Sequence, residues 1–230
     1  LQAMGSLVRI AHADMGSRSD AFRVISRVRS DPQPFIGIWH ASGTLSDALL
    51  MGQTARSLRH VTSSKAVAAA LLNCASHASP LHAFVCFSSV TTLLGSSGQS
   101  NYSTANSVLD SLSTARHSIG CRTLSIQWGP WATSGMAAGD IIARRWYARG
   151  YDLISIAHGL AALSLALQNE QTLAVIAVVP ARWNTLLRSM SRMSSFLQHL
   201  HSSTYRPMVS KDSSVQTGSA GALDTVMIME

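Results

Sequence analysis

Short apolar runs alternate along this chain with longer segments of helical periodicity, and this alternation limits the fold more than any other feature of the sequence. Strands that alternate with helices predict an α/β protein, in which a parallel sheet carries helices on both faces. The predicted strands are 7–11, 35–39, 81–87, 122–128 and 173–179. The predicted helices are 19–29, 54–77, 101–118, 180–200 and a segment whose apolar stripe we expect in the core, formed by Ile156, Leu160, Leu163 and Leu167.

The composition excludes several classes of protein. A chain of 230 residues can bury a sizeable core, and an apolar fraction of 47% argues against disorder. Three cysteines are too few for a disulfide scaffold and their spacing matches no zinc pattern, so we expect a cytoplasmic protein without a metal site. The uncharged stretch 66–109 is interrupted by polar residues and a proline, which argues against a membrane span.

The net charge of +7 leaves three interpretations open, of which a solvated basic surface is favoured. Five basic residues and no acidic residue occur between Arg182 and Lys211, so contact with an acidic partner is the second interpretation. Nucleic-acid binding is the weakest, because the chain contains no helix-turn-helix, zinc-finger or ribonucleoprotein pattern.

Polar or small residues follow four of the predicted strands. In order along the chain they are Asp14, then His40-Ala41-Ser42-Gly43, then Ser88-Ser89, then Gly129-Pro130-Trp131. Ligands of open α/β sheets bind beyond the carboxyl ends of the strands, so we expect these residues to line one cleft. The small residues after the second strand would let a flat ligand approach the backbone, although His40 itself is better explained as structural.

The long helix predicted over 101–118 adds Tyr102 and Asn106, which share a face because they are four residues apart. A tyrosine with a pKa near 10 is a poor acid–base catalyst at neutral pH. An ammonium group beside the phenol, from Lys65, would lower the pKa of the tyrosine. A hydroxyl such as that of Ser89 could then hold a substrate carbonyl beside the phenol.

Three segments give the sequence a family resemblance. They are Phe87-Ser88-Ser89-Val90, Gly98-Gln99-Ser100-Asn101-Tyr102-Ser103-Thr104-Ala105-Asn106 and Gln127-Trp128-Gly129-Pro130-Trp131. They resemble the ketoreductase domains of type I polyketide synthases and animal-type fatty acid synthases, within the short-chain dehydrogenase/reductase superfamily. Most members of that superfamily have a lysine four residues after the tyrosine. Here Asn106 holds that place and Lys65 lies upstream, an exchange that is typical of the synthase ketoreductases.

The resemblance extends over about residues 1–200 and implies a Rossmann-like doubly wound sheet that reduces a 3-ketoacyl thioester with NADPH. It implies that Tyr102 is the general acid, that Lys65 maintains the acidity of this tyrosine and that Ser89 binds the substrate carbonyl. Asn106 would complete the proton relay. The partners it implies are an acyl carrier protein, which bears the 3-ketoacyl chain on phosphopantetheine, and other synthase domains. The implied cofactor-binding residues are Asp14, Met15, His40, Ala41, Ser42, Gly43, Lys65, Pro130 and Trp131.

The chain also departs from the family pattern. It contains no Gly-x-Gly-x-x-Gly loop, and by the family's topology the first two strands of the sheet are missing. We therefore expect a piece of a longer ketoreductase that is inactive alone, and the alternative is a non-catalytic structural remnant of a synthase ketoreductase. Two features resemble the ketoreductases that give a D-configured 3-hydroxyl product. Leu94 holds the place of the tryptophan typical of the opposite type, and Leu45-Ser46-Asp47 keeps the last aspartate of the Leu-Asp-Asp that many such domains carry.

Two further segments have alternative interpretations. Residues 201–230 are rich in Ser, Thr and Gly, and we expect a flexible linker toward an acyl-carrier domain. The basic segment 144–149 is either a solvated helix or, by its place in the mobile lid of the family, a contact for an acidic acyl carrier.

Overall fold

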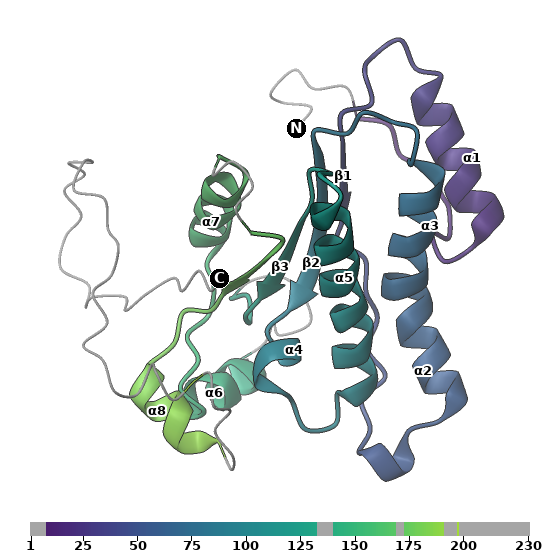
Figure 1. The fold of residues 1–230 in the computed structure, drawn as a ribbon. Coiled ribbons are helices and arrows are strands. Elements are labelled where there is room, and N and C mark those ends of the chain that lie inside the picture. Colours follow the sequence, from purple (N-terminus) through teal and green to yellow (C-terminus); the bar gives the residue numbers. More distant parts are fainter. Residues whose placement is uncertain (1–7, 133–139, 169–172, 191–196, 198–230) are drawn as a thin grey trace, which may run out of the picture. The chain divides into compact units, whose positions relative to one another are not determined.

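The computed structural model describes residues 8–132, 140–168, 173–190 and 197 (Figure 1). Four strands form one sheet in the order β1 (Gly37–His40), β2 (Ala83–Ser89), β3 (Leu124–Trp128), β4 (Val175–Val178). β1 and β2 are parallel, with Gly37 opposite Ala83 and His40 opposite Cys86. Helices flank this parallel sheet, which confirms the predicted α/β fold class.

The chain divides into two compact units that are described separately below. The first comprises Leu1–Ile126 with Leu173–Val175, and the second comprises Gln127–Thr172 with Ile176–Glu230. Both β3 and β4 contribute residues to each unit. Residues 201–230, predicted to be a linker, lie outside the described residues.

In the first unit, helices pack around the hydrophobic core beside β1 and β2. Its helices are α1 (Arg18–Arg29), α2 (Ala55–Thr62), α3 (Ala68–Ala75), the short α4 (Thr91–Leu94) and α5 (Ser100–Ser118). α5 lies beside the run of α2 and α3, and α1 packs against α3 (Figure 1). The core combines residues of the strands and helices: Ile25, Ile38, Ala69, Leu72, Phe84, Cys86 and Leu109.

The helix predicted over 54–77 is present, but one turn of it is widened. Thr54 caps α2, because its hydroxyl accepts from the Ser57 amide while the Ser57 hydroxyl accepts from the Thr54 amide. Between α2 and α3 lies η3 (Ser63–Val67), a single π-helical turn that the periodicity of the sequence did not predict. Lys65 lies on this turn.

The strand predicted over 7–11 is wrong, because residues 8–11, its part within the described residues, form no regular structure. A strand needs a hydrogen-bonding partner, and β1 is the edge of the sheet among the described residues. A run of β-branched residues is therefore not sufficient to make a strand here.

The second unit is built around tryptophan and tyrosine packing. Its helices are α6 (Asp140–Ala148), α7 (Ile156–Gln168) and α8 (Trp183–Ser189), so the last helix is shorter than predicted within the described residues. The rings of Trp128 and Trp131 lie 5.0 Å apart, as do those of Trp146 and Tyr151. Ile154 and Leu186 are fully buried.

The predicted core stripe of α7 is wrong. Ile156, Leu160 and Leu167 are exposed and Leu163 is half-buried, whereas the helix buries Gly159 and Ala162. The reason is the bulk of Trp131, since a Cβ on Gly159 would lie 2.1 Å from the Trp131 ring. The large ring can pack only against the face of α7 that carries small residues.

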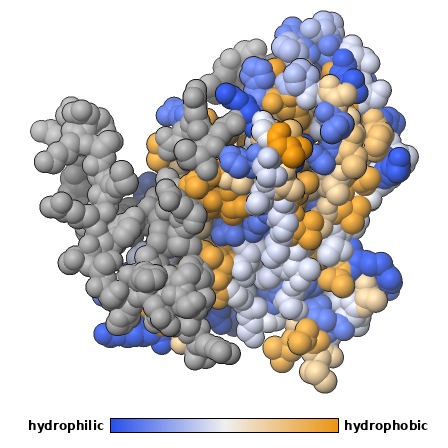
Figure 2. Space-filling view, viewed as in Figure 1, coloured by the Kyte–Doolittle hydropathy of each residue, from blue (hydrophilic) through white to orange (hydrophobic). Residues whose placement is uncertain are grey.

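Exposed apolar side chains also gather on η2 (Leu50–Gly52), a 3₁₀ turn in the first unit. Figure 2 shows them as an orange group at the lower edge, where Leu49, Leu50 and Met51 are exposed. Within the described residues, no helix combines the length and the apolarity needed to cross a lipid bilayer.

Candidate active site

Tyr102 lies in the first turn of α5, and the loop before α2 holds this end of the helix in place. The Asn101 side chain accepts from the Tyr102 amide and donates to the Ser46 carbonyl at 2.8 Å. The Ala48 amide donates to the Gly98 carbonyl, and Gln99 donates to Asp47. Sequence reasoning missed this clamp, because it joins segments about fifty residues apart.

Asn106 follows Tyr102 by one helical turn, as predicted, and is completely buried. Its Nδ2 donates to the Tyr102 carbonyl at 2.9 Å. Its Oδ1 has no hydrogen-bond partner among the described residues, so this buried oxygen can accept a hydrogen bond from a bound molecule.

Ser89 ends β2 and is buried beside α5. Its hydroxyl accepts from the Thr91 amide at 3.3 Å and from the Thr91 hydroxyl at 3.2 Å. The neighbouring Ser88 instead donates to the Asn106 carbonyl, so it links strand and helix. Of the two serines, Ser89 is the one beside the phenol of Tyr102.

Lys65 reaches the same place from η3 and is only 3% exposed. Its Nζ donates to the Phe87 carbonyl at 2.8 Å and lies 5.5 Å from the centroid of the Tyr102 ring. Burial lowers the pKa of Lys65 to about 8, against the opposing effects of Cys86 and Asp110. The structure thus brings Lys65, Ser89, Tyr102 and Asn106 together in the first unit.

The expected direction of the tyrosine pKa is wrong. Burial raises the pKa of Tyr102 above its ordinary value, and the polar side chains of Asn106 and Ser89 only partly oppose this effect. The Lys65 amine lies over the face of the ring, where it contacts π electrons and makes its hydrogen bond elsewhere. The structure therefore keeps the phenol protonated at neutral pH.

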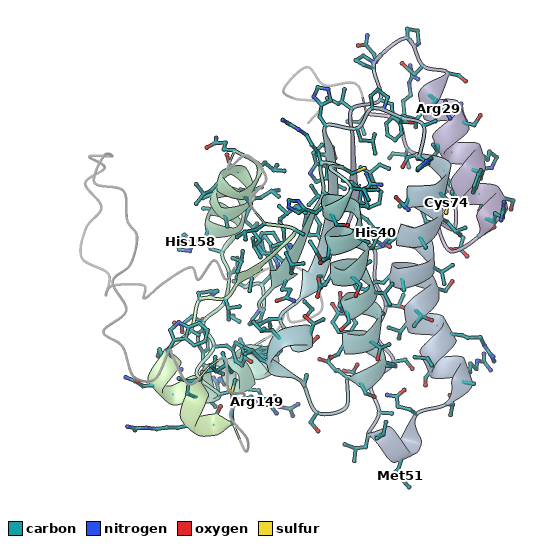
Figure 3. The ribbon with its side chains drawn as sticks, in the orientation of Figure 1. Arg29, His40, Met51, Cys74, Arg149 and His158 are labelled. Carbon is teal, nitrogen blue, oxygen red and sulfur yellow. The ribbon has the colours of Figure 1, made fainter. Side chains whose placement is uncertain are left out.

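The turn after β1 divides into a buried and an exposed part. The His40 ring is buried and its Nε2 lies 2.9 Å from the Lys65 carbonyl, so it is turned into the protein (His40 is labelled in Figure 3). Ala41, Ser42 and Gly43 are exposed beside the Lys65 side chain. These three residues have small side chains, so the backbone of this turn is exposed.

The remaining predicted cofactor residues lie on other segments of the chain. The Asp14 carboxylate accepts from the Gly16 amide in a local turn, and Met15 packs against the core of the first unit. Pro130 and Trp131 belong to the second unit, where the Pro130 carbonyl accepts from the Ile154 amide. Among the described residues, no three His, Cys, Asp or Glu side chains are grouped so that they could hold a metal ion.

Solved structures of known proteins share this fold. A short-chain dehydrogenase from Streptomyces avermitilis aligns with a TM-score of 0.68 at 19% identity, over 87% of this chain and 80% of that one. A ketoreductase from the first module of phoslactomycin biosynthesis, in Streptomyces sp. HK803, aligns with a TM-score of 0.78 at 27% identity, over 84% of this chain and 45% of that one. The fold is therefore the Rossmann fold of the short-chain dehydrogenases.

Sequence comparison narrows this class to one family. The family model of the KR (ketoreductase) domain matches residues 1–133, more than half of the chain, and the chain belongs to this family. Polyketide synthase GfsA of Streptomyces halstedii is 32% identical over 78% of this chain, and mellein synthase of Phaeosphaeria nodorum is 36% identical over 60% of it. The chain spans 2% and 8% of the lengths of these two relatives.

Proposed function

We propose that this chain supplies the catalytic residues of a polyketide synthase ketoreductase. The reaction is the reduction of a 3-ketoacyl thioester, tethered to an acyl carrier protein, to the 3-hydroxyacyl thioester with NADPH. The observation that carries the proposal is the buried cluster of Tyr102, Lys65, Ser89 and Asn106. The family membership and the polyketide synthase relatives support it.

In this mechanism the substrate ketone lies between Ser89 and Tyr102. The cofactor, when bound, supplies a hydride to the carbonyl carbon. The Ser89 hydroxyl donates to the carbonyl oxygen, and the Tyr102 hydroxyl transfers its proton to that oxygen as the alcohol forms. Because the pKa of Tyr102 is raised, its hydroxyl keeps the proton until the carbonyl oxygen accepts it.

Lys65 and Asn106 act after the proton has left Tyr102. The ammonium group over the ring stabilises the phenolate, and at neutral pH most of the Lys65 amine is charged because its pKa is about 8. The unpartnered Asn106 Oδ1 can hold a water that returns a proton to the phenolate.

The residues present fit only part of a nicotinamide dinucleotide. The exposed turn of Ala41, Ser42 and Gly43 would flank the nicotinamide. By the family resemblance, Pro130 and Trp131 would also contact the nicotinamide half, and Asp14 and Met15 the adenine. The pyrophosphate has no equivalent support, because no Gly-x-Gly-x-x-Gly occurs in the 230 residues. A Gly-x-Gly-x-x-Gly turn encoded upstream of Leu1 would supply this support, whereas a native gene without it would favour the second candidate, a structural remnant that packs against other synthase domains.

Product configuration and carrier docking extend the proposal. Leu94 and Asp47 favour a D-configured 3-hydroxyl, by resemblance to the ketoreductases of that type. Arg144, Arg145 and Arg149 are exposed on and just after α6, which suits contact with an acidic acyl carrier protein.

The test of the enzyme proposal is a Tyr102→Phe substitution. The chain is joined to the Gly-rich half of a related polyketide synthase ketoreductase, and reduction of a 3-ketoacyl thioester is followed by loss of NADPH absorbance. Tyr102→Phe should lower kcat about 100-fold or more and leave NADPH affinity unchanged, because the phenol acts on the substrate oxygen. Tyr151→Phe is the matched control, since Tyr151 is a buried tyrosine of the second unit and should keep activity. An active Tyr102→Phe variant would contradict the proposed role, and an inactive parent would favour the remnant.

NADPH binding by the 230 residues alone gives a second prediction. Several charge-assisted hydrogen bonds to the pyrophosphate are absent, each worth about 1.5–3 kcal/mol, and about 1.4 kcal/mol corresponds to tenfold in affinity. We therefore expect no NADPH binding at micromolar concentration in a fluorescence titration, and no reductase activity. Micromolar affinity would mean that the Gly-rich half is dispensable.

A further inference from the structure

The π turn that carries Lys65 is held by side chains from a distant segment. A π turn inserts one extra residue into a helix and disturbs the regular hydrogen bonding of its carbonyls. In η3 the Ala68 amide is shared between the Ser63 and Lys65 carbonyls. Such a turn persists only where other groups stabilise it.

Three residues that end β1 or follow it supply these groups. His40 Nε2 lies 2.9 Å from the Lys65 carbonyl. The Ser42 hydroxyl donates to the carbonyl of the preceding residue, Ser64. The Thr44 hydroxyl donates to the His60 carbonyl at 3.3 Å. A carbonyl can only accept, so His40 must carry its proton on Nε2. Burial lowers the pKa of His40, which favours the neutral ring, while the hydrogen bond to the Lys65 carbonyl acts in the opposite direction.

The same segment makes room for the Lys65 side chain. A Cβ on Gly43 would lie 2.7 Å from Lys65 Cε, so only glycine leaves the stem its present path. Along that path the amine reaches the Phe87 carbonyl and lies over the Tyr102 ring. Each residue of a regular α-helix corresponds to a rotation of about 100° around the helix axis. If η3 relaxed to that geometry, the position of Lys65 would therefore rotate by about 100°.

We infer that His40 is a positioning residue, whose hydrogen bond to the Lys65 carbonyl holds the π turn and thereby directs the Lys65 amine into the site. Its importance for catalysis depends on the function proposed above, whereas the placement of Lys65 can be tested without any activity. His40 would thus act on Lys65, which agrees with the structural role favoured for it from the sequence.

The chain is well suited to such a test, because Lys65 and Lys211 are its only lysines. Lysine labelled with ¹³C at Cε gives two side-chain NMR signals, which Lys211→Arg assigns. In the unaltered chain Lys65 should titrate near its pKa of about 8. Cys86 and Asp110, the other titratable groups that act on Lys65, are the same in every variant, as is Tyr102.

His40→Leu removes the hydrogen-bond donor and should move the Lys65 midpoint from about 8 toward the ordinary 10.5. His40→Gln should retain the low midpoint, because the amide nitrogen can donate from nearly the same position. Ile38→Ala is the control for general destabilisation, since Ile38 is a buried core residue on the same strand. It should lower the melting temperature and leave the Lys65 midpoint unchanged.

The inference is overturned if His40→Leu leaves the Lys65 signal in place, or if Ile38→Ala moves it equally. Should His40→Leu not fold, Ser42→Ala replaces it, because Ser42 is exposed and its loss removes another support of the turn. The inference is also overturned if the Lys65 signal is unchanged in Ser42→Ala and displaced in His40→Gln. A rejoined ketoreductase that proves inactive would refute the proposed function and leave this readout unaffected.

Discussion

Burial favours the neutral form of both Lys65 and Tyr102, and it therefore shifts their pKa values in opposite directions. The pKa of the amine falls to about 8 and the pKa of the phenol rises. A charge on either group alone would be energetically unfavourable in this buried environment. Placed 5.5 Å from the ring centroid, the ammonium can offset the charge of a phenolate only when that phenolate forms. The pair can therefore stabilise a phenolate that exists only briefly.

Gly43 gives a prediction at the scale of one residue. Gly43→Ala should displace the Lys65 side chain with little loss of stability, because the conflicting atom belongs to a flexible stem. We expect the ¹³Cε signal of Lys65 to move and the melting temperature to stay nearly constant.

Gly52→Ala is the matched control for Gly43→Ala. Its added Cβ would meet only the Ala48 side chain, at an ordinary 3.7 Å. A Lys65 signal that moves in neither variant would contradict the close approach at Gly43.

At the scale of elements, α7 shows that an apolar stripe does not decide which face of a helix is buried. Three of the four large residues of the stripe are exposed, and the face with Gly159 and Ala162 is buried. Four apolar residues at helical spacing predicted the helix correctly. Their burial depended on the partner, and Trp131 fits only against glycine.

Two substitutions on α7 separate these faces. Gly159→Ala raises intrinsic helix propensity by about 1 kcal/mol, yet it should destabilise the protein by about 1–3 kcal/mol because its Cβ overlaps the Trp131 ring. Leu160→Gln, on the exposed stripe, should change the free energy of unfolding by less than about 0.5 kcal/mol. Urea denaturation measures both, and the reverse order of effects would show that the stripe is the packed face.

At the scale of the whole molecule, two buried bases make stability depend on pH. The folded pKa values of His40 and Lys65 are both lowered by burial, so the unfolded chain binds more protons than the folded one. Stability should therefore rise with pH in two windows. The first is the range just below the ordinary His value of 6.5, and the second begins near pH 8, where folded Lys65 loses its proton.

Urea denaturation between pH 5 and pH 9 tests this dependence. The rise below pH 6.5 should disappear in His40→Gln, and the rise above pH 8 should disappear in Lys65→Met. Each slope is at most about 1.4 kcal/mol per pH unit for one proton. Cys86, whose pKa is raised to about 12, acts in the opposite direction as the unfolded thiol ionises near 9, and it is present in all three proteins, so the comparison between them isolates the effects of His40 and Lys65. Parallel curves for all three proteins would contradict the burial of these groups.

The sequence by itself determined the features that depend on local spacing. Alternating runs predicted the α/β fold, and the helical period predicted that Tyr102 and Asn106 share a face. The position of Ser89 at a strand end followed from the same pattern. These properties depend on residues a few positions apart, so the sequence contains them directly.

Only the tertiary structure decided what depends on distant neighbours. The π turn, its support by His40 and the path of Lys65 over Gly43 join segments more than twenty residues apart. The direction of the Tyr102 pKa, the exposed stripe of α7 and the absence of a strand at residues 8–11 likewise differ from expectation. Desolvation, packing partners and strand pairing are properties of the folded chain, because each is set by what surrounds a residue in space.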